Sequence, residues 1–212
     1  MPAPSALAVF VAATLALLLV PGPAVIYVVT QSIDRGRRAG LASVGGIHSG
    51  TVVHIAAATV GLSAVLASSA VAFDAVKYAG AAYLIVVGLR RLAGRDRAES
   101  TDARPDRTLG QLYRQGIVVN VLNPKTALFF LAFLPQFVDP SRGAAWEQIL
   151  LLGLLFACLG LLTDSSWALV AGTFGQWLRG STGYLRVQRY VSGAVFVGLG
   201  ALAALSAPVK KH

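Results

Sequence analysis

Two long uncharged stretches constrain this chain more than any other feature. Residues 1–33 and 39–73 contain no Lys, Arg, Asp or Glu. A helix of about 20 apolar residues crosses the hydrocarbon core of a bilayer, which is about 30 Å thick. Only 13% of the 212 residues are charged, where about 25% is usual in soluble domains. The sequence therefore predicts an all-α integral membrane protein, and it excludes a soluble enzyme.

The hydropathy pattern predicts six transmembrane helices. They cover residues 5–31, 40–66, 71–92, 115–138, 148–178 and 190–206. Within a single membrane domain we expect a first three-helix half over 1–93, a cytoplasmic linker over 94–113 and a second half over 114–212. Because three is odd, two similar halves would have opposite orientations, as in many secondary transporters. The predicted fold is two inverted three-helix repeats.

The basic residues predict the orientation. Thirteen of the 18 Lys and Arg residues follow the first, third and fifth spans, and four lie on the opposite side. Loops rich in Lys and Arg stay in the cytoplasm, so we expect both termini on the outer face of a bacterial inner membrane. The same rule accounts for the net charge of +9 without a nucleic-acid partner.

Proline interrupts the first span of each half near its middle, as Pro21-Gly22-Pro23 and as Asn123-Pro124-Lys125. An interior proline removes a hydrogen bond to the carbonyl four residues earlier, and transporters bind their substrates at such broken helices. A simple proline kink is the alternative. The predicted substrate-binding residues are Pro21, Gly22, Pro23, Asn120, Asn123, Pro124 and Lys125.

Two charged residues lie far inside predicted spans. Lys125 is about ten residues into the fourth span, or roughly 15 Å deep, and Asp164 is near the centre of the fifth. Charges at such depth are costly and indicate a functional site. We expect Asp164 to pair with Lys125, either for function or as a structural ion pair.

Asp164 and His54 are the predicted proton-coupling residues. An imidazole changes its charge near neutral pH, and His54 lies near the centre of the second span. A hydrogen-bonded packing role is an equal alternative for His54. A structural role is favoured for His48, which lies nearer the cytoplasmic end.

Several polar and small residues keep two interpretations. Asn120 and Asn123 would either satisfy freed backbone groups or face the substrate. Gly46 and Gly50 suit close helix packing, either inside the chain or in a homodimer. Cys158 is the single cysteine, so no disulfide or thiolate metal site is expected within one chain, and we predict no metal and no cofactor.

Four segments resemble the LysE/RhtB family of amino-acid exporters. They are Pro21-Gly22-Pro23, the glycine-rich second span with His54 and Gly61, residues 116–125 (GIVVNVLNPK) and residues 129–137 (FFLAFLPQF). The resemblance covers nearly the whole chain. It implies six-span inner-membrane exporters of amino acids that are coupled to the proton gradient. Many family members carry an acidic residue where this chain has Thr51, which places more weight on Asp164.

The functional prediction is export of amino acids or close analogues by proton antiport, with the amino acid, protons and the bilayer as partners. The main alternative is an exporter or channel for another small polar solute or a metal ion. An intramembrane enzyme would need Ser165 or Ser166 as nucleophile with Lys125 as base, but no GxSxG or HExxH motif is present. A scaffold would gain nothing from polar groups placed at one depth.

Overall fold

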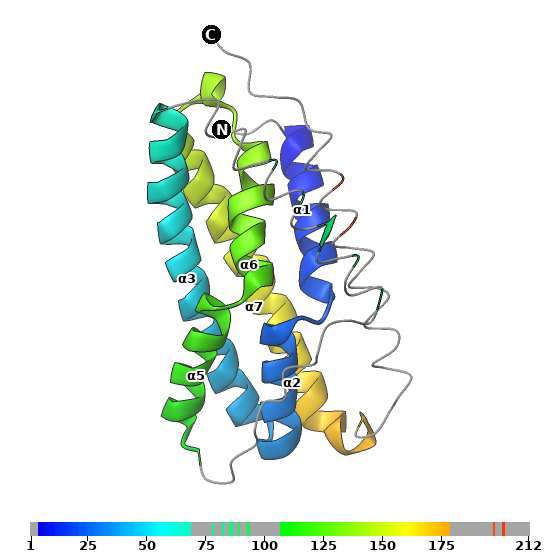
Figure 1. Ribbon diagram of the computed structural model, residues 1–212. Helices are drawn as coiled ribbons and strands as arrows, with labels where there is room; N and C mark the ends of the chain where they lie inside the picture. The colour runs from blue at the N-terminus through cyan, green and yellow to red at the C-terminus, as the bar shows by residue number, and fades with distance from the viewer. Residues whose placement is uncertain are drawn as a thin grey trace.

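The computed structural model describes residues 4–68 and 107–178, with a few single residues between 78 and 93 and at 197 and 201. The described part contains helices and their connections and no strand. Its helices of ten residues or more, and the short α6, are shown in Figure 1. They are α1 (Pro4–Leu19), α2 (Pro23–Arg35), α3 (Arg37–Ser68), α5 (Leu109–Val121), α6 (Pro124–Leu128) and α7 (Ala145–Leu178).

Two of these helices are unbroken and long and apolar enough to cross a membrane. The qualifying stretches are Arg37–Gly61 in α3 and Ala145–Phe174 in α7. Two bent pairs qualify when each is counted as one span: α1 with α2, bent by 49°, and α5 with the helical turns that reach Phe137, bent by 45°. The described residues therefore hold two to four candidate spans, in agreement with the predicted helical membrane protein.

The bent pairs run in opposite directions through the bundle. In Figure 1, α1 and α2 descend while α5 and α6 ascend, and α3 and α7 are likewise antiparallel to each other. Each bent pair is followed along the chain by one long helix. The order of a broken span and then a long span thus occurs twice, with its direction reversed.

Both breaks arise where the sequence places proline at the start of a new helix. Pro23 and Pro124 occupy the first turn of α2 and α6, where the missing N–H costs no intrahelical bond. The Asn123 side chain caps α6 by accepting from the Lys125 amide, 3.0 Å away. By contrast, no side chain caps α2, which begins after Gly22.

Glycines bring α3 close to α5. Gly46 and Gly116 face each other, and a Cβ added to either would meet the backbone of the other helix. A Cβ on Gly50 would lie 2.9 Å from the Cβ of Asn120 and 3.0 Å from the Ile117 carbonyl oxygen. The pair Gly46 and Gly50 therefore serves a contact inside the chain, which decides between the two alternatives of the sequence analysis.

A cluster of aromatic side chains packs among α1, α7 and the turn that follows α6. Phe129 lies at its centre, with ring centroids 4.5 Å from Phe156, 5.3 Å from Phe133 and 5.8 Å from Phe10. Phe10, Phe129 and Phe133 are at most 1% exposed. The cluster packs α1, which precedes the first break, against α7 and against the π-helical turn Phe129–Phe133, which follows the second break.

The predicted helix boundaries agree with α3 and α7 but not with α5. This helix begins at Leu109, earlier than the predicted start at residue 115 and inside the segment predicted as linker. The cause is a capping box that the hydropathy pattern does not show: the Thr108 side chain accepts from the Gln111 amide, and the Gln111 side chain accepts from the Thr108 amide. The predicted spans 71–92 and 190–206 lie outside the continuously described residues.

The junction of α2 with α3 and the start of α5 lie at the same end of the bundle (Figure 1), and Arg35, Arg37 and Arg107 belong to these segments. Arg35 donates to the Arg107 carbonyl at 3.0 Å, and Arg37 donates to the Thr173 hydroxyl of α7 at 3.0 Å. Arg107 also donates to Gln115. These contacts place the first and third loops on the same side, as the charge count predicts.

Candidate functional site

A small cavity lies where the two helix breaks meet, at the middle of α3 and α7. Its walls come from α1, α2, α3, α5, α6 and α7. Leu17, Leu18, Val25, Ile47 and Phe156 form much of its apolar surface. Its polar lining residues are His48, Thr51, Asn120, Asn123, Lys125, Thr126 and Asp164.

Lys125 joins the two breaks directly. It lies in the first turn of α6, its residue is 8% exposed, and its Nζ donates to the carbonyl oxygen of Val20 at 2.6 Å. Val20 follows the last residue of α1, so this carbonyl lies at the negative end of that helix. The ammonium group of the second broken span thus compensates the partial negative charge at the end of α1 in the first broken span.

Gly22 leaves the space that the lysine side chain crosses. A Cβ at this position would lie 2.9 Å from Cδ of Lys125 and 3.5 Å from its Nζ. The Pro-Gly-Pro sequence therefore has two separate roles. Pro23 starts α2, and Gly22 provides the close approach that lets Lys125 reach Val20.

Asn120 connects α3, α5 and α6. Its Nδ2 donates to the Ile47 carbonyl at 2.8 Å and to the Thr51 hydroxyl at 2.9 Å. Its Oδ1 accepts from the Thr126 hydroxyl at 3.0 Å and from Asn123 Nδ2 at 3.3 Å. Both donors and both lone pairs of this amide are used, so the structure favours backbone and helix fixation over substrate contact for Asn120.

His54 also supports the second break. Its Nε2 donates to the Asn120 carbonyl at 2.9 Å, which is the carbonyl that Pro124 deprives of its helical partner. Its ring stacks on Phe130, with centroids 5.9 Å apart and planes 14° apart. His54 is not among the residues that line the cavity. These contacts suit the alternative of a hydrogen-bonded packing residue, and the proton-coupling role of His54 stays a prediction.

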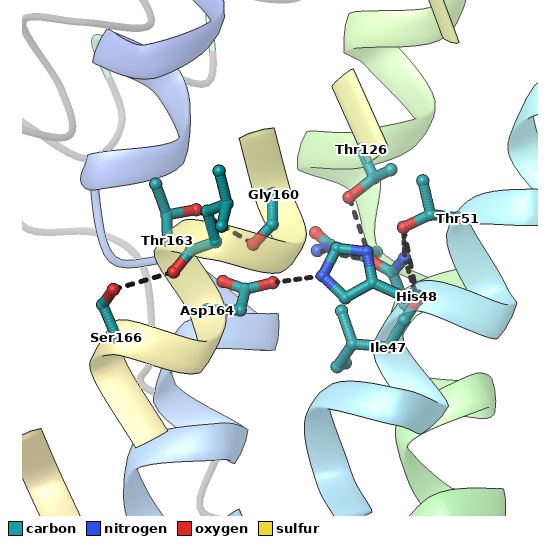
Figure 2. Close-up of polar contacts among 11 residues, drawn as sticks. Ile47, His48, Thr51, Thr126, Gly160, Thr163, Asp164 and Ser166 are labelled. Atoms are coloured by element: carbon teal, nitrogen blue, oxygen red, sulfur yellow. Dashed lines mark hydrogen bonds and ion pairs between the residues drawn. The ribbon is translucent and has the colours of Figure 1, made fainter. Parts of the chain in front are cut away.

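His48 and Asp164 form a buried pair across the cavity (Figure 2). The distance from His48 Nε2 to Asp164 Oδ2 is 3.2 Å, and the two side chains are 15% and 6% exposed. Gly160, one turn before Asp164 on α7, makes room for the imidazole, since a Cβ there would lie 3.0 Å from His48 Cε1. The second ring nitrogen, His48 Nδ1, is buried and has no hydrogen-bond partner among the described residues.

The expected pairing of Lys125 with Asp164 is therefore wrong for this conformation. Both side chains line the cavity, but Asp164 pairs with His48 and Lys125 donates to Val20. Sequence reasoning favoured a structural role for His48 and did not predict its contact with Asp164. Residues 48 and 164 are 116 positions apart, and no local pattern reports which faces of α3 and α7 meet.

The cavity is small in this conformation. Its volume is about 30 Å³, where a single water needs roughly 10–15 Å³ on the same scale. It therefore has room for about two water molecules. Within residues 4–68 and 107–178, no three His, Cys, Asp or Glu side chains are arranged to hold a metal ion.

Comparison with known proteins identifies the kind of protein that carries this site. A family model described as LysE type translocator matches residues 15–207. An uncharacterised membrane protein of Vibrio cholerae is 32% identical over 88% of this chain and 90% of its own length. The homoserine/homoserine lactone efflux proteins of Salmonella typhi and Salmonella typhimurium are each 32% identical over 89% of this chain and 90% of their own.

No solved structure matches the chain. The family match covers most of the sequence, including both helix breaks and every polar residue of the cavity. Its members are membrane transporters, so the sequence resemblance to exporters is confirmed and an enzymatic function is excluded. The chain belongs to the LysE type translocator family.

Proposed function

We propose that this protein exports amino acids or close analogues across the bacterial inner membrane by proton antiport. The observation that carries the proposal is the meeting of two broken helices at one polar cavity, with Lys125 of one break bonded to Val20 of the other. Discontinuous helices with this arrangement bind substrates near the middle of the membrane in many secondary transporters.

The first break offers partners for both charged groups of an amino acid. The end of α1 presents the Val20 carbonyl, which suits an ammonium group. The start of α2 presents amide groups that no side chain caps, at Ala24 and Val25, and both residues line the cavity. Helix N-termini of this kind bind carboxylates. A zwitterion therefore fits across the break, with Lys125 as a second partner for its carboxylate.

The relatives suggest the chemical class of the substrate. The Salmonella proteins are named for the efflux of homoserine and of homoserine lactone. These two compounds share a primary amino group and differ in the carboxylate, which the lactone has lost to ring closure. We propose that this chain exports small amino acids of the same kind as homoserine, and that their amino group is recognised at the first break.

The pair of His48 and Asp164 is the proposed proton-coupling site. Among the described residues, three charged or titratable side chains line the cavity: His48 from α3, Lys125 from α6 and Asp164 from α7. Binding a proton to the pair, at the unpartnered Nδ1 of His48 or at the carboxylate, changes the charge that faces Lys125. Asp164 keeps the role predicted from sequence, while His48 takes the one predicted for His54.

The complete fold is proposed to be six spans in two inverted repeats. The support is the repeated order of a broken and a long helix with reversed direction, and the similar bends of 49° and 45°. The two halves extend over 1–93 and 114–212 in this proposal, and the basic end of the bundle faces the cytoplasm.

Transport by the purified full chain in lipid vesicles tests the proposal. Vesicles are loaded with labelled homoserine, and release is followed with and without a pH gradient. We expect the gradient to accelerate release by the wild type, and Asp164→Asn to remove this acceleration. Asp139→Asn, which changes a half-exposed carboxylate in the loop before α7, is the matched control and retains it.

The same assay separates the main alternative. A channel, or a carrier without proton coupling, would release homoserine at the same rate with and without the pH gradient when the membrane potential is held constant. An exporter of another solute would release no amino acid at all. Equal gradient-driven release by the wild type and Asp164→Asn would remove Asp164 from the coupling site.

A further inference from the structure

We infer that Lys125 is an internal ligand, which occupies the substrate's amino-group site at the end of α1 and is displaced when substrate binds. The inference rests on the proposed function, since it specifies how one group of an exported amino acid is recognised. It assigns to the Val20 carbonyl a binding role that the sequence motifs do not indicate.

The ammonium group of Lys125 is the same functional group as the α-ammonium of an amino acid. It donates to the Val20 carbonyl at 2.6 Å, a distance at the short end of the range for charge-assisted bonds. The carbonyl lies at the negative end of α1, where a cation is favoured. The Val20 carbonyl accepts a hydrogen bond from the lysine ammonium, and it can accept one from any other primary ammonium group in the same way.

The cavity has room for about two water molecules, which is too little for an amino acid. The Lys125 side chain passes directly beside Gly22 and lines this cavity. Its withdrawal would enlarge the cavity beside Val20 and open the carbonyl at the same time. The lysine is therefore placed where its movement makes room for the substrate.

Displacement would also give the lysine a new partner. Once the substrate ammonium takes the Val20 carbonyl, the Lys125 ammonium faces the incoming carboxylate beside the start of α2. The contact of Lys125 with Val20 is exchanged for two contacts with a zwitterion. An amine without a carboxylate would make only the first of these contacts, so it competes with Lys125 poorly in the wild type.

Chemical complementation of a truncated lysine tests the inference. Lys125→Ala removes the atoms from Cγ to Nζ, which correspond to n-propylammonium. We expect this compound, at about tenfold its dissociation constant, to raise the unfolding midpoint of the purified Lys125→Ala chain by about 3–6 °C. The wild type should show no rise, because its own lysine holds the site. Tetramethylammonium, a cation without N–H donors, should raise neither midpoint.

A folded Lys125→Ala chain that does not respond to propylammonium would overturn the inference, as would an equal response by the wild type. If Lys125→Ala does not fold alone, Lys125→Met serves instead, since its flexible side chain carries no ammonium; a smaller rise is expected, and no rise overturns the inference. Wild-type homoserine release is measured separately. Propylammonium binding without release would refute the proposed function and keep the ammonium site, and release without propylammonium binding would do the reverse.

Discussion

The imidazole of His54 donates its Nε2 proton to the carbonyl oxygen of Asn120 at 2.9 Å. This contact adds a second donor to a carbonyl that Pro124 cannot bond and that also accepts from the Asn123 amide, 3.0 Å away. A residue on α3 thus stabilises the break between α5 and α6. Within a membrane, carbonyls freed by proline need such partners because lipid provides none.

Replacing His54 tests this role. We expect His54→Leu to leave the Asn120 carbonyl with the Asn123 amide as its donor and to lower the stability by about 0.5–1.5 kcal/mol, measured as a lower unfolding midpoint in detergent. His54→Gln keeps an N–H donor and should lose less. Both variants should retain acceleration of homoserine release by a pH gradient. Loss of that acceleration in a stable His54→Gln chain would show that His54 takes part in proton coupling.

Asn120 is expected to be among the most sensitive polar positions. Asn120→Ala removes four hydrogen bonds from a residue that is 1% exposed and leaves partners on α3 and α6 unsatisfied. Because such networks lose more than one bond's contribution, we expect a loss of at least about 2 kcal/mol. Ser166→Ala, at an exposed position on α7, is the control and should change the unfolding midpoint little.

The glycine contact between α3 and α5 predicts a contrast between two alanine substitutions. A methyl group at Gly46 would collide with the Tyr113 carbonyl and approach Gly116, whereas a methyl group at Gly61 would meet nothing within 4 Å. We expect Gly46→Ala to destabilise the fold by about 1–3 kcal/mol and Gly61→Ala to be neutral or slightly stabilising. A Gly46→Ala chain with normal stability but altered mass in solution would instead indicate a contact between protomers.

Crowding of His48 should alter the pH dependence of transport. Gly160→Ala would place a Cβ 3.0 Å from His48 Cε1 and move the imidazole relative to Asp164. The matched variant is Gly153→Ala on the same helix, where a Cβ would lie 3.0 Å from the Ile55 side chain. Both add similar strain, but only Gly160→Ala should shift the pH profile of homoserine release. Identical shifts in the two variants would mean that packing between α3 and α7 is the cause.

The loop before α7 allows a test by titration. Hydrogen bonds from Ser141, with a smaller contribution from the Arg142 guanidinium, lower the pKa of Asp139 below its usual value. A depressed carboxyl pKa favours the folded state when the group is ionised, so this contribution is present at neutral pH and is lost as the pH falls below about 4. Ser141→Ala should raise the pKa of Asp139, measured by carbon-detected NMR of the carboxyl group. An unchanged pKa would contradict the assigned cause.

Much of the architecture follows from local sequence signals. The uncharged stretches predict the long helices α3 and α7, and the two proline motifs predict breaks at the positions where α2 and α6 begin. These features depend on residues within a few turns of one another. The start of α5 was missed only because its capping box, Thr108 with Gln111, lies in a polar segment that hydropathy assigns to a loop.

The polar contacts of the site did not follow in the same way. The sequence indicates that Lys125 and Asp164 are costly in a membrane, and proximity of opposite charges suggests that they pair. The structure joins Lys125 to Val20 and Asp164 to His48, across separations of 105 and 116 residues. No charged group marks Val20 as a partner, because its role comes from a backbone carbonyl at the end of a helix.

The sequence by itself determined that this protein lies in a membrane, where its described helices run and where two of them break, because each property depends on hydropathy or backbone chemistry over a short stretch. Only the tertiary structure decided which side chain meets each broken end. That choice depends on the rotation and crossing of α3, α5 and α7, which approach one another closely at Gly46, Gly116 and Gly172. The glycines bring the helices together, and the polar partners follow from that approach.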